Sequence, residues 1–308
     1  MTGQYSIRRW FQHLKVTCSK FNFGVNMSAY GENEDQGKSW NEKTGRSWAE
    51  HDQEMNSRLQ NISDILFAEI EEKSLSNALD IGCGAGTTTL RMAQKLSGRG
   101  AVTGIDFSDA LLTLAREKAS TVDNMTFTWA DAQSHRFEPV GIDGAFSRFG
   151  VMFFADPDKA FANLRSALVP GSKLVFVCWA PLQDNPFFLE PMEVGHKHTG
   201  AAIKMPGIAP GPMAFSDRDY LSGILRRAGY RTADITTHKT TLDTHQNPQE
   251  DAALLMKIGA GARMLSESEP SKAQVQSVRD DFVLLSAAKR HGDITRYPAT
   301  IHLVTAVA

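Results

Sequence analysis

The chain has 308 residues, of which 42% are hydrophobic and 22% are charged, so it can bury a large core and has the composition of a globular enzyme. A formal net charge of −2 gives no electrostatic reason to expect a nucleic acid or an anionic membrane as the main partner. Three cysteines, far apart in sequence, exclude a disulfide framework and a paired zinc site. We therefore expect a cytoplasmic protein in a reducing compartment.

The N-terminus is the one candidate targeting segment. Residues 1–31 contain four basic residues and no acid, a composition that transit peptides share, but they lack the continuous apolar run of a secretory signal. Met27 is an alternative start of a shorter chain. We interpret residues 1–39 as an N-terminal extension and residues 40–308 as the functional domain. The whole chain lacks an apolar run long enough to predict a membrane span.

Helix and strand signals alternate from residue 47 onwards. Residues 47–72 contain no Pro or Gly and carry apolar residues at helical spacing, which predicts one long helix. Asp156 and Pro157 predict the N-terminus of a later helix. Strands are expected at 78–81, 101–106, 125–130, 143–149 and 173–179, and helices at 87–97 and 108–119. This alternation predicts an α/β protein with a doubly wound, mostly parallel sheet.

After Trp179 the alternation stops for about thirty-five residues rich in Pro, Gly and Met. We interpret 181–215 as a lid or binding loop, in which Phe187 and Phe188, together with Trp179, contact the substrate. A helix at 216–228 and a strand near 230–242 follow, then a helical insertion at 249–290 and an extended run at 299–307.

The strongest chemical signal is Asp80-Ile81-Gly82-Cys83-Gly84-Ala85-Gly86, at the end of the first predicted strand. Glycines let the chain turn sharply into a helix and let a ligand approach the backbone. Asp106 ends the next strand, where an acid can accept hydrogen bonds from the ribose hydroxyls of an adenosine. The alternative to a ligand-binding loop is an ordinary strand-to-helix turn, with Asp106 as a helix-capping acid.

The spacing of the glycines separates two adenosine ligands. A dinucleotide site has G-x-G-x-x-G, whereas this chain has G-x-G-x-G. Asp80 would also repel a pyrophosphate, but it suits the ammonium of the methionyl group of S-adenosylmethionine (SAM). The sequence therefore favours SAM over NAD.

From about Trp40 to its end, the chain resembles the class I SAM-dependent methyltransferases. Besides the glycine loop, the matching stretches are Asp106-Phe107-Ser108, Ala130-Asp131-Ala132 and the region from Asp143 to Asp156. Within the last of these, SRFGVMFFADP is similar to a bacterial subgroup of small-molecule methyltransferases related to the ubiquinone and menaquinone C-methylases.

The resemblance implies roles for several residues. Asp131 and Ala132 would hold the adenine, Ser147, Arg148 and Phe149 would line the pocket, and 299–307 would insert antiparallel beside the fifth strand. Phe107, beside Asp106, would join the cofactor site. In the alternative interpretations Asp131 caps a helix and Arg148 is a surface residue that pairs with Asp143 or Asp156. The helices at 249–290 and the first 39 residues depart from the family pattern.

Trp40 and Trp48 allow two interpretations. Aromatic residues eight positions apart at the start of a helix are commonly core residues, but the segment could instead fold over SAM with an aromatic face against the sulfonium. N-terminal helices cover the ligand in the family that the chain resembles. His51 then becomes a candidate to contact the substrate or act as a base.

We therefore predict methyl transfer from SAM to a small-molecule acceptor, with release of S-adenosylhomocysteine. The sequence does not determine whether the acceptor atom is N, S, C or O. It also does not determine whether the protein forms a homodimer. No conspicuous acid–base pair appears, which favours an intrinsically nucleophilic acceptor over a hydroxyl. We expect no metal, because His196 and His198 lack a third ligand. The alternatives are a methyltransferase acting on a macromolecule and a catalytically silent SAM-binding scaffold.

Overall fold

A computed structural model describes residues 33–138 and 141–308. Within them, one eight-stranded sheet has the order β3-β2-β1-β4-β5-β8-β6, with β7 paired to β8. Its strands are β1 (Asn77–Ile81), β2 (Ala101–Asp106), β3 (Met125–Trp129), β4 (Ile142–Arg148), β5 (Leu168–Trp179), β6 (Thr232–Thr244), β7 (Arg290–His291) and β8 (Ile294–Val307). β1 to β5 are parallel, whereas β8 runs antiparallel to both β5 and β6. The predicted fold class and the antiparallel last strand are confirmed.

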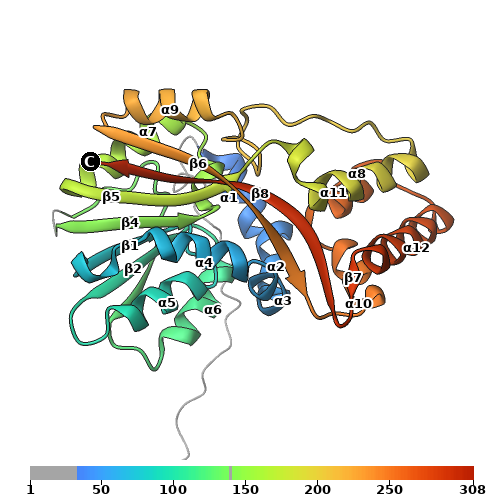
Figure 1. The fold of residues 1–308 in the computed structure, drawn as a ribbon, viewed down its shortest axis with the longest axis horizontal. Coiled ribbons are helices and arrows are strands. Elements are labelled where there is room, and N and C mark those ends of the chain that lie inside the picture. Colours follow the sequence, from blue (N-terminus) through green and yellow to red (C-terminus); the bar gives the residue numbers. More distant parts are fainter. Residues whose placement is uncertain (1–32, 139–140) are drawn as a thin grey trace, which may run out of the picture.

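Helices cover both faces of the sheet (Figure 1). α4 (Gln60–Glu69), α5 (Thr87–Lys95) and α6 (Asp109–Ala119) lie on one face, and α7 (Pro157–Ala167) and α9 (Arg218–Arg227) lie on the other. The sheet is buried between them because its central strands are apolar on both sides, as Phe176 and Val177 of β5 illustrate. The carboxyl ends of β1 to β4 meet at one edge, which is where a doubly wound sheet binds its ligand.

The single helix predicted over 47–72 is wrong. The chain instead forms the short helices α1 (Glu34–Asn41), α2 (Lys43–Glu50) and α3 (Asp52–Arg58) before α4, with non-helical dihedral angles at His51 and Leu59. No Pro or Gly forces these breaks, so local propensity could not reveal them. They let the segment bend around the carboxyl edge of the sheet, where Leu59 is buried in the core.

A helical subdomain lies beyond the carboxyl edge, on the right of Figure 1. It consists of α10 (Pro248–Leu255), α11 (Gly259–Ser268), α12 (Lys272–Ala288) and α8 (Pro186–Thr199), and the long antiparallel pair of strands β6 and β8 reaches out to it. The helical character predicted for 249–290 is confirmed. Among the described residues, no helix combines the length and the apolar composition that a membrane span requires.

The segment 181–215 is not one loop. α8 occupies 186–199 because Pro186 suits the first turn of a helix, and the buried amide of Asn185 fastens its start. Asn185 Nδ2 donates to the carbonyl oxygens of Ala180 and Thr300, and its Oδ1 accepts from Thr300 N. Proline content alone suggested a loop, whereas α8 has Pro186 in its first turn and also contains Pro191 in its interior.

Three short 3₁₀ turns complete the described chain: η3 (Glu72–Ser74), η4 (Gly150–Phe153) and η5 (Leu182–Asp184). The boundary expected between residues 39 and 40 falls within α1. The interpretation of residues 1–31 as an extension or a targeting segment lies outside the described residues.

Candidate active site

The glycine loop follows β1 with all three glycines in the left-handed region, at φ of +66° for Gly82, +54° for Gly84 and +76° for Gly86. A Cβ on Gly82 would lie 2.6 Å from Gly150 Cα, and one on Gly86 would lie 2.6 Å from the Phe127 ring. A Cβ on Gly84 would meet nothing within 4 Å. The first and third glycines therefore serve packing, whereas the second borders open space where a ligand can approach.

Asp80 lies beneath this loop and is fully buried. Its Oδ2 accepts from the hydroxyls of Thr88 and Thr89, both at 2.7 Å, and its Oδ1 is buried with no partner among the described residues. Burial raises the pKa of Asp80 to about 6, against the opposing effect of the two hydroxyls. Sequence reasoning missed both threonines, although the run Thr87–Thr89 at the start of α5 was a visible signal.

Asp106, at the end of β2, braces the glycine loop. Its Oδ2 accepts from Gly84 N at 2.9 Å, and its Oδ1 accepts from Ser108 N at 2.8 Å. It does not cap α6, whose N-cap residue is Ser108. Burial raises the pKa of Asp106, and these backbone donors oppose the shift. The adjacent Phe107 contributes its carbonyl oxygen, which accepts from Asn41 Nδ2 at 2.7 Å.

Asp131 and Ala132 follow β3 and are both buried. Asp131 Oδ1 accepts from Gln133 N at 3.0 Å and from Asn33 Nδ2 at 3.4 Å. Asp131 Oδ2 is buried with no partner among the described residues. Like Asp80, it keeps one enclosed acceptor, which fits the exocyclic amine of an adenine. Asn33, the first described residue, carried no sequence signal.

Ser147 joins the end of β4 to the glycine loop. Its hydroxyl donates to Ile81 O at 2.7 Å and accepts from Gly150 N at 3.1 Å. Ser147 is fully buried, so its observed role is to hold β4 and the turn after β1 at a fixed separation.

Arg148 pairs with neither of the two acids considered for it, Asp143 and Asp156. Its guanidinium donates to Ser63 Oγ at 2.8 Å and to Asn56 Oδ1 at 2.5 Å. Burial lowers its pKa to about 10, while the charge of Asp80 acts in the opposite direction. Asp143 instead accepts from Ser76 and Asn77, and Asp156 caps α7, so the surface interpretation of Arg148 is wrong.

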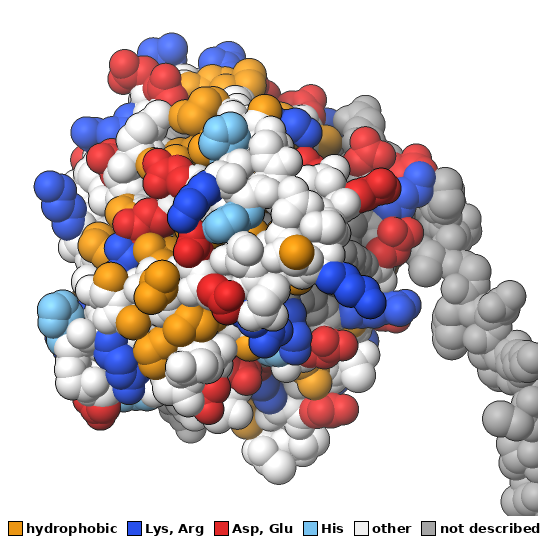
Figure 2. All heavy atoms as spheres, turned by 90° about the vertical axis from the view of Figure 1, so that its right-hand side faces the viewer, with side chains coloured by type: hydrophobic (Ala, Val, Ile, Leu, Met, Phe, Trp, Pro, Cys, Tyr) orange, Lys and Arg blue, Asp and Glu red, His pale blue; other side chains and the backbone are white. Residues whose placement is uncertain are grey.

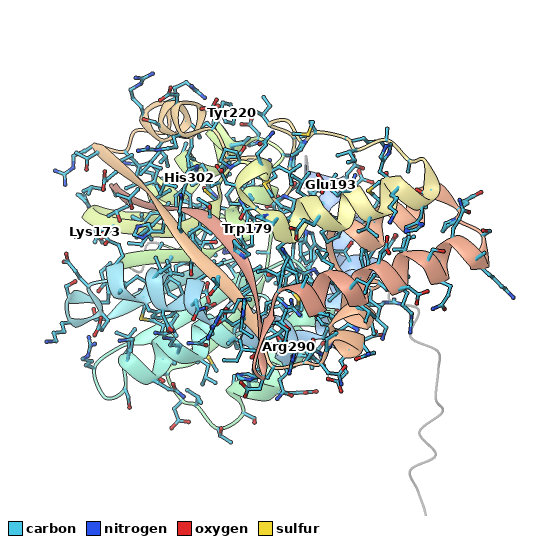
Figure 3. All side chains as sticks on the ribbon, turned by 45° about the vertical axis from the view of Figure 1, so that its right-hand side comes forward. Lys173, Trp179, Glu193, Tyr220, Arg290 and His302 are labelled. Atoms are coloured by element: carbon cyan, nitrogen blue, oxygen red, sulfur yellow. The ribbon has the colours of Figure 1, made fainter. Side chains whose placement is uncertain are left out.

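A line of aromatic rings, here called the aromatic row, runs from β4 to β8. It begins at Phe149, a non-glycine residue held at φ +69°, a strained conformation of the kind that clusters at functional sites. Phe149 stacks on Trp179 with ring centroids 4.3 Å apart. The row continues through Phe188, Phe187 and Tyr297 with centroid separations of 5.0, 5.4 and 5.5 Å. Figure 3 shows Trp179 where the sheet meets α8.

The N-terminal helices cap the carboxyl edge of β2. Ser108 Oγ donates to Trp40 O at 2.9 Å, and the Trp40 ring packs edge-on against Phe153 at 5.1 Å. Trp48 lies 6.2 Å from Trp40 and packs against Met55, Leu254 and Ile258. Both tryptophans thus make core contacts close to the site, and contact with SAM stays a prediction for them.

His51 lies at the joint between α2 and α3, and its Nε2 is buried without a partner among the described residues. Its role as a base or a substrate contact stays a prediction.

Cavities between described residues lie near the sheet. One, of about 210 Å³, includes Ser63 and Thr88, which hydrogen-bond to Arg148 and Asp80, so it adjoins the glycine-loop site. The other, of about 770 Å³, lies between α9, β6 and β8. In Figure 3, Tyr220 marks α9 and His302 marks β8. None of Asp80, Asp106 and Asp131 lines the larger cavity, so we do not assign the cofactor to it.

The sequence of the chain is similar to those of known methyltransferases. Residues 78–171 match the family model described as "Methyltransferase domain". The chain is 33% identical over 98 residues to a demethylmenaquinone methyltransferase of Staphylococcus aureus, which is 32% of this chain and 41% of that protein. It is 25% identical over 162 residues to a 2-phytyl-1,4-naphtoquinone methyltransferase of Thermosynechococcus vestitus, which is 50% of this chain and 72% of that protein.

The solved structure of a methyltransferase candidate from Bacillus halodurans shares the fold. It has a TM-score of 0.50 at 16% identity and covers 80% of this chain and 97% of its own. The sequence alignment with the Staphylococcus protein spans less than half of that protein's length. The matched region contains the glycine loop and the carboxyl ends of β1 to β4.

Proposed function

We propose that this chain, whose residues 78–171 match a methyltransferase domain, is a class I SAM-dependent methyltransferase that methylates a small-molecule acceptor and releases S-adenosylhomocysteine. One observation carries the proposal. Asp80 and Asp131 each keep a buried carboxylate oxygen without a described partner, and a Cβ on Gly84, in the loop that follows Asp80, would meet nothing within 4 Å. Buried acceptors of this kind are costly unless a ligand pairs with them.

The three acids suit three parts of SAM. Asp80 would hold the methionyl ammonium, Asp106 the ribose hydroxyls and Asp131 the adenine amine, in the order in which β1, β2 and β3 lie side by side. The charge of Arg148 near Asp80 suits the methionyl carboxylate. Gly82, Gly86, Phe107, Ala132 and Ser147 would shape the site without carrying charge to it.

SAM supplies a methyl group that its sulfonium already activates, so the protein mainly aligns the acceptor and excludes water. Trp40, Trp48 and α1 would exclude water above the site. His51 offers an unpartnered imidazole nitrogen for an acceptor whose nucleophilic atom carries a proton. The acceptor atom itself is undetermined.

The acceptor would lie along the aromatic row, against Trp179, Phe187 and Phe188. Stacking against rings suits a flat molecule with an aromatic or otherwise apolar part. The two sequence relatives are named for methylating naphthoquinone-type molecules, which are also flat. We therefore propose a flat, ring-containing acceptor, and a functional domain that spans residues 40–308 with α8 and α10–α12 on its acceptor side.

A small acceptor fits the surface better than a polyanion does. Hydrophobic side chains and both signs of charge are interspersed on the face of the helical subdomain (Figure 2), and the net charge is −2. Cys83 and Cys178 are buried and unpaired, which supports a reducing compartment such as the cytoplasm.

The test is incubation of the purified chain with methyl-labelled SAM and fractionated cell extract. We expect S-adenosylhomocysteine and a labelled product whose formation depends on the dialysable fraction, followed by its identification by mass. Label in the retained fraction would support a macromolecular acceptor instead. SAM binding without turnover in any fraction would support a silent scaffold.

A further inference from the structure

The first two helices of the described chain contribute little to the hydrophobic core. α1 and α2 lie within residues 34–50, and the fully buried residues described in them are the glycines Gly37 and Gly45. Trp40 and Trp48 are only half-buried, and the first buried hydrophobic side chain after residue 33 is Met55, in α3. A segment with few buried apolar contacts needs little free energy to open locally.

Neither helix would be stable by itself. Each has eight residues and contains a glycine, which lowers helix propensity. Isolated helices of this length are marginal in water. α1 and α2 are therefore helical because they dock on the rest of the chain, and their stability depends on those docking contacts.

Asn33, at the start of α1, makes the docking contact that is nearest to the adenine site. It is the N-cap residue of α1, but its side chain makes no capping hydrogen bond, and its Nδ2 donates instead to Asp131 Oδ1 at 3.4 Å. Asn33 Oδ1 and Asp131 Oδ2 are both buried without a partner among the described residues. Two neighbouring acceptors suit the two N–H groups of an amine. The contact is therefore completed by a donor such as the amino group of adenine.

The far end of α1 is tied to the residues that follow β2. Asn41 Nδ2 donates to Phe107 O at 2.7 Å, and Asn41 Oδ1 accepts from Asp109 N at 3.0 Å. These two residues flank Ser108, which is bonded to Asp106. The contacts of α1 thus lie beside the acids proposed to hold the ribose and the adenine.

The chain after α2 is anchored more firmly. Arg58, in α3, forms an ion pair with Asp251 in which both side chains are completely inaccessible. Between α2 and α3, His51 has φ of −118° and ψ of 24°, outside the helical region. Residues at the ends of elements absorb the dihedral changes of a moving lid, so His51 is the natural hinge. Ser47 Oγ, which donates to Lys257 O at 3.2 Å, is one turn before this hinge, where a turning lid moves least.

The adenosine acids are enclosed in the described structure. Neither cavity described above is lined by Asp106 or Asp131, and Asp131 is buried in contact with Asn33. Adenosine therefore reaches them only after a covering element moves, and α1 and α2 have few core contacts to lose. The methionyl half of the site lies at Asp80, whose partners Thr88 and Thr89 belong to α5.

We propose that α1 and α2, here called the N-terminal lid, turn about His51 and close on the adenosine half of the cofactor, with Asn33 as the latch at the adenine. α3 and the methionyl half of the site stay in place. S-Adenosylhomocysteine leaves when the lid opens, so lid opening limits cofactor exchange. The inference rests on the proposed function, because it assumes that Asp106 and Asp131 hold adenosine.

Hydrogen exchange of the whole chain, followed by mass spectrometry, measures lid opening. In ligand-free protein, the amides of the N-terminal lid should exchange at least about tenfold faster than those of α4, where Ile62 and Leu66 are completely buried. Equal rates in the two regions would show that α1 and α2 form a fixed wall, and the proposal would be wrong.

Three ligands locate the trigger. S-Adenosylhomocysteine and 5′-methylthioadenosine share the adenosine, whereas homocysteine carries only the amino-acid end. Both adenosine ligands, at saturation, should slow exchange in the N-terminal lid at least about tenfold, and homocysteine should not. If 5′-methylthioadenosine fails to bind or to slow exchange, or if homocysteine slows it, adenosine is not the trigger and the proposal is overturned.

The latch is tested by Asn33→Ala. This variant should lose most of the ligand-induced slowing and release S-adenosylhomocysteine several-fold faster than wild-type protein. The matched control is Asn61→Ala, which removes an asparagine contact outside the lid, from α4 to Thr241 O at 3.2 Å, and should behave as wild type. Wild-type slowing in Asn33→Ala would contradict the latch.

Calorimetry measures the affinity of every variant for S-adenosylhomocysteine. Absence of binding to wild-type protein would sink the proposed function together with the ligand-driven closure. Binding without slowed exchange in the N-terminal lid would sink only this inference.

Discussion

The carboxyl edge of the sheet, with Asp80, Asp106 and Asp131, is here called the cofactor edge, and the ion pair between Arg58 and Asp251 is called the Arg58 junction. Both are polar and buried, yet they are built in different ways. At the cofactor edge, Asp106 and Asp131 are held by backbone N–H groups, such as those of Gly84, Ser108 and Gln133. At the junction, Arg58 and Asp251 are 193 positions apart and meet only through their side chains. The first site follows from strand order, whereas the second exists only when the helical subdomain docks on the sheet.

This difference indicates where substitutions should act. Changes at the cofactor edge should alter SAM affinity with little effect on which acceptor is chosen. Changes on the acceptor side should alter turnover while SAM binding persists. The following experiments test that division, from the largest expected effect to the smallest.

Gly84→Val should produce the largest effect. Its Cβ would enter the open space beside the loop, so SAM affinity should fall by about 100-fold or more, equivalent to about 2.7 kcal/mol. Calorimetric titration measures this loss. The matched control is Gly98→Val, at φ +75° in the turn after α5, where a Cβ also meets nothing within 4 Å. The two variants share the backbone strain, so equal SAM affinity in both would mean that the loop is only structural.

Asp106→Ala should weaken SAM binding by about 1–3 kcal/mol, because the ribose hydroxyls lose a charged acceptor. Asp143→Ala is the comparison, since Asp143 also accepts several hydrogen bonds but does so from Ser76 and Asn77, beside the amino end of β1. Titration of a folded Asp106 variant with wild-type affinity would contradict the ribose assignment.

Phe187→Ala combined with Phe188→Ala should lower substrate turnover by about tenfold or more, with little change in SAM affinity, because the aromatic row loses two rings. Phe215→Ala removes a fully buried ring that packs on Phe161, and it should lower stability without this selective loss of turnover. Steady-state kinetics and titration are compared for each variant. A proportional fall in both quantities would place the acceptor elsewhere, most simply beneath α10–α12.

The smallest expected effect is a pH dependence of SAM binding. The pKa of Asp80 is raised to about 6, so its carboxyl group loses its charge as the pH falls through that value. An ammonium favours the ionised form, so SAM affinity should rise several-fold between about pH 5 and about pH 7. Titrations across this range should be flatter for Asp80→Asn, and an unchanged slope would assign the dependence to another group.

The raised pKa of Asp80 also makes the free energy of unfolding depend on pH. A carboxyl group whose folded pKa lies above its unfolded value favours the folded state most when it is protonated. Asp80 therefore lowers the free energy of unfolding as the pH rises from about 4 to about 6, and bound SAM should offset this loss. Melting curves of wild-type protein and Asp80→Asn should differ most above that window.

Several features of the fold were legible in the sequence because they depend on neighbours in the chain. The alternation of apolar strands and amphipathic helices predicted β1 to β5 and α5 to α7, and Asp156-Pro157 marked the start of α7. The glycine loop could be read in the same way, because its turn involves residues that are close in sequence, and the acid at the end of β2 could be read from its place at the end of a predicted strand. The long helix over 47–72 failed because its breaks at His51 and Leu59 follow from packing on the sheet edge, which no local residue announces.

The sequence by itself determined the sheet, the glycine loop and the preference for SAM, because backbone geometry and spacing set all three. Only the tertiary structure decided that Arg148 donates to Ser63 and Asn56, that Phe149 stacks on Trp179, and that Arg58 is enclosed with unused donors. These contacts join α3, α4, β4, β5 and α10 across large sequence separations. Their energies depend on burial and mutual geometry, which exist only once the helical subdomain and the N-terminal helices have closed over the carboxyl edge of the sheet.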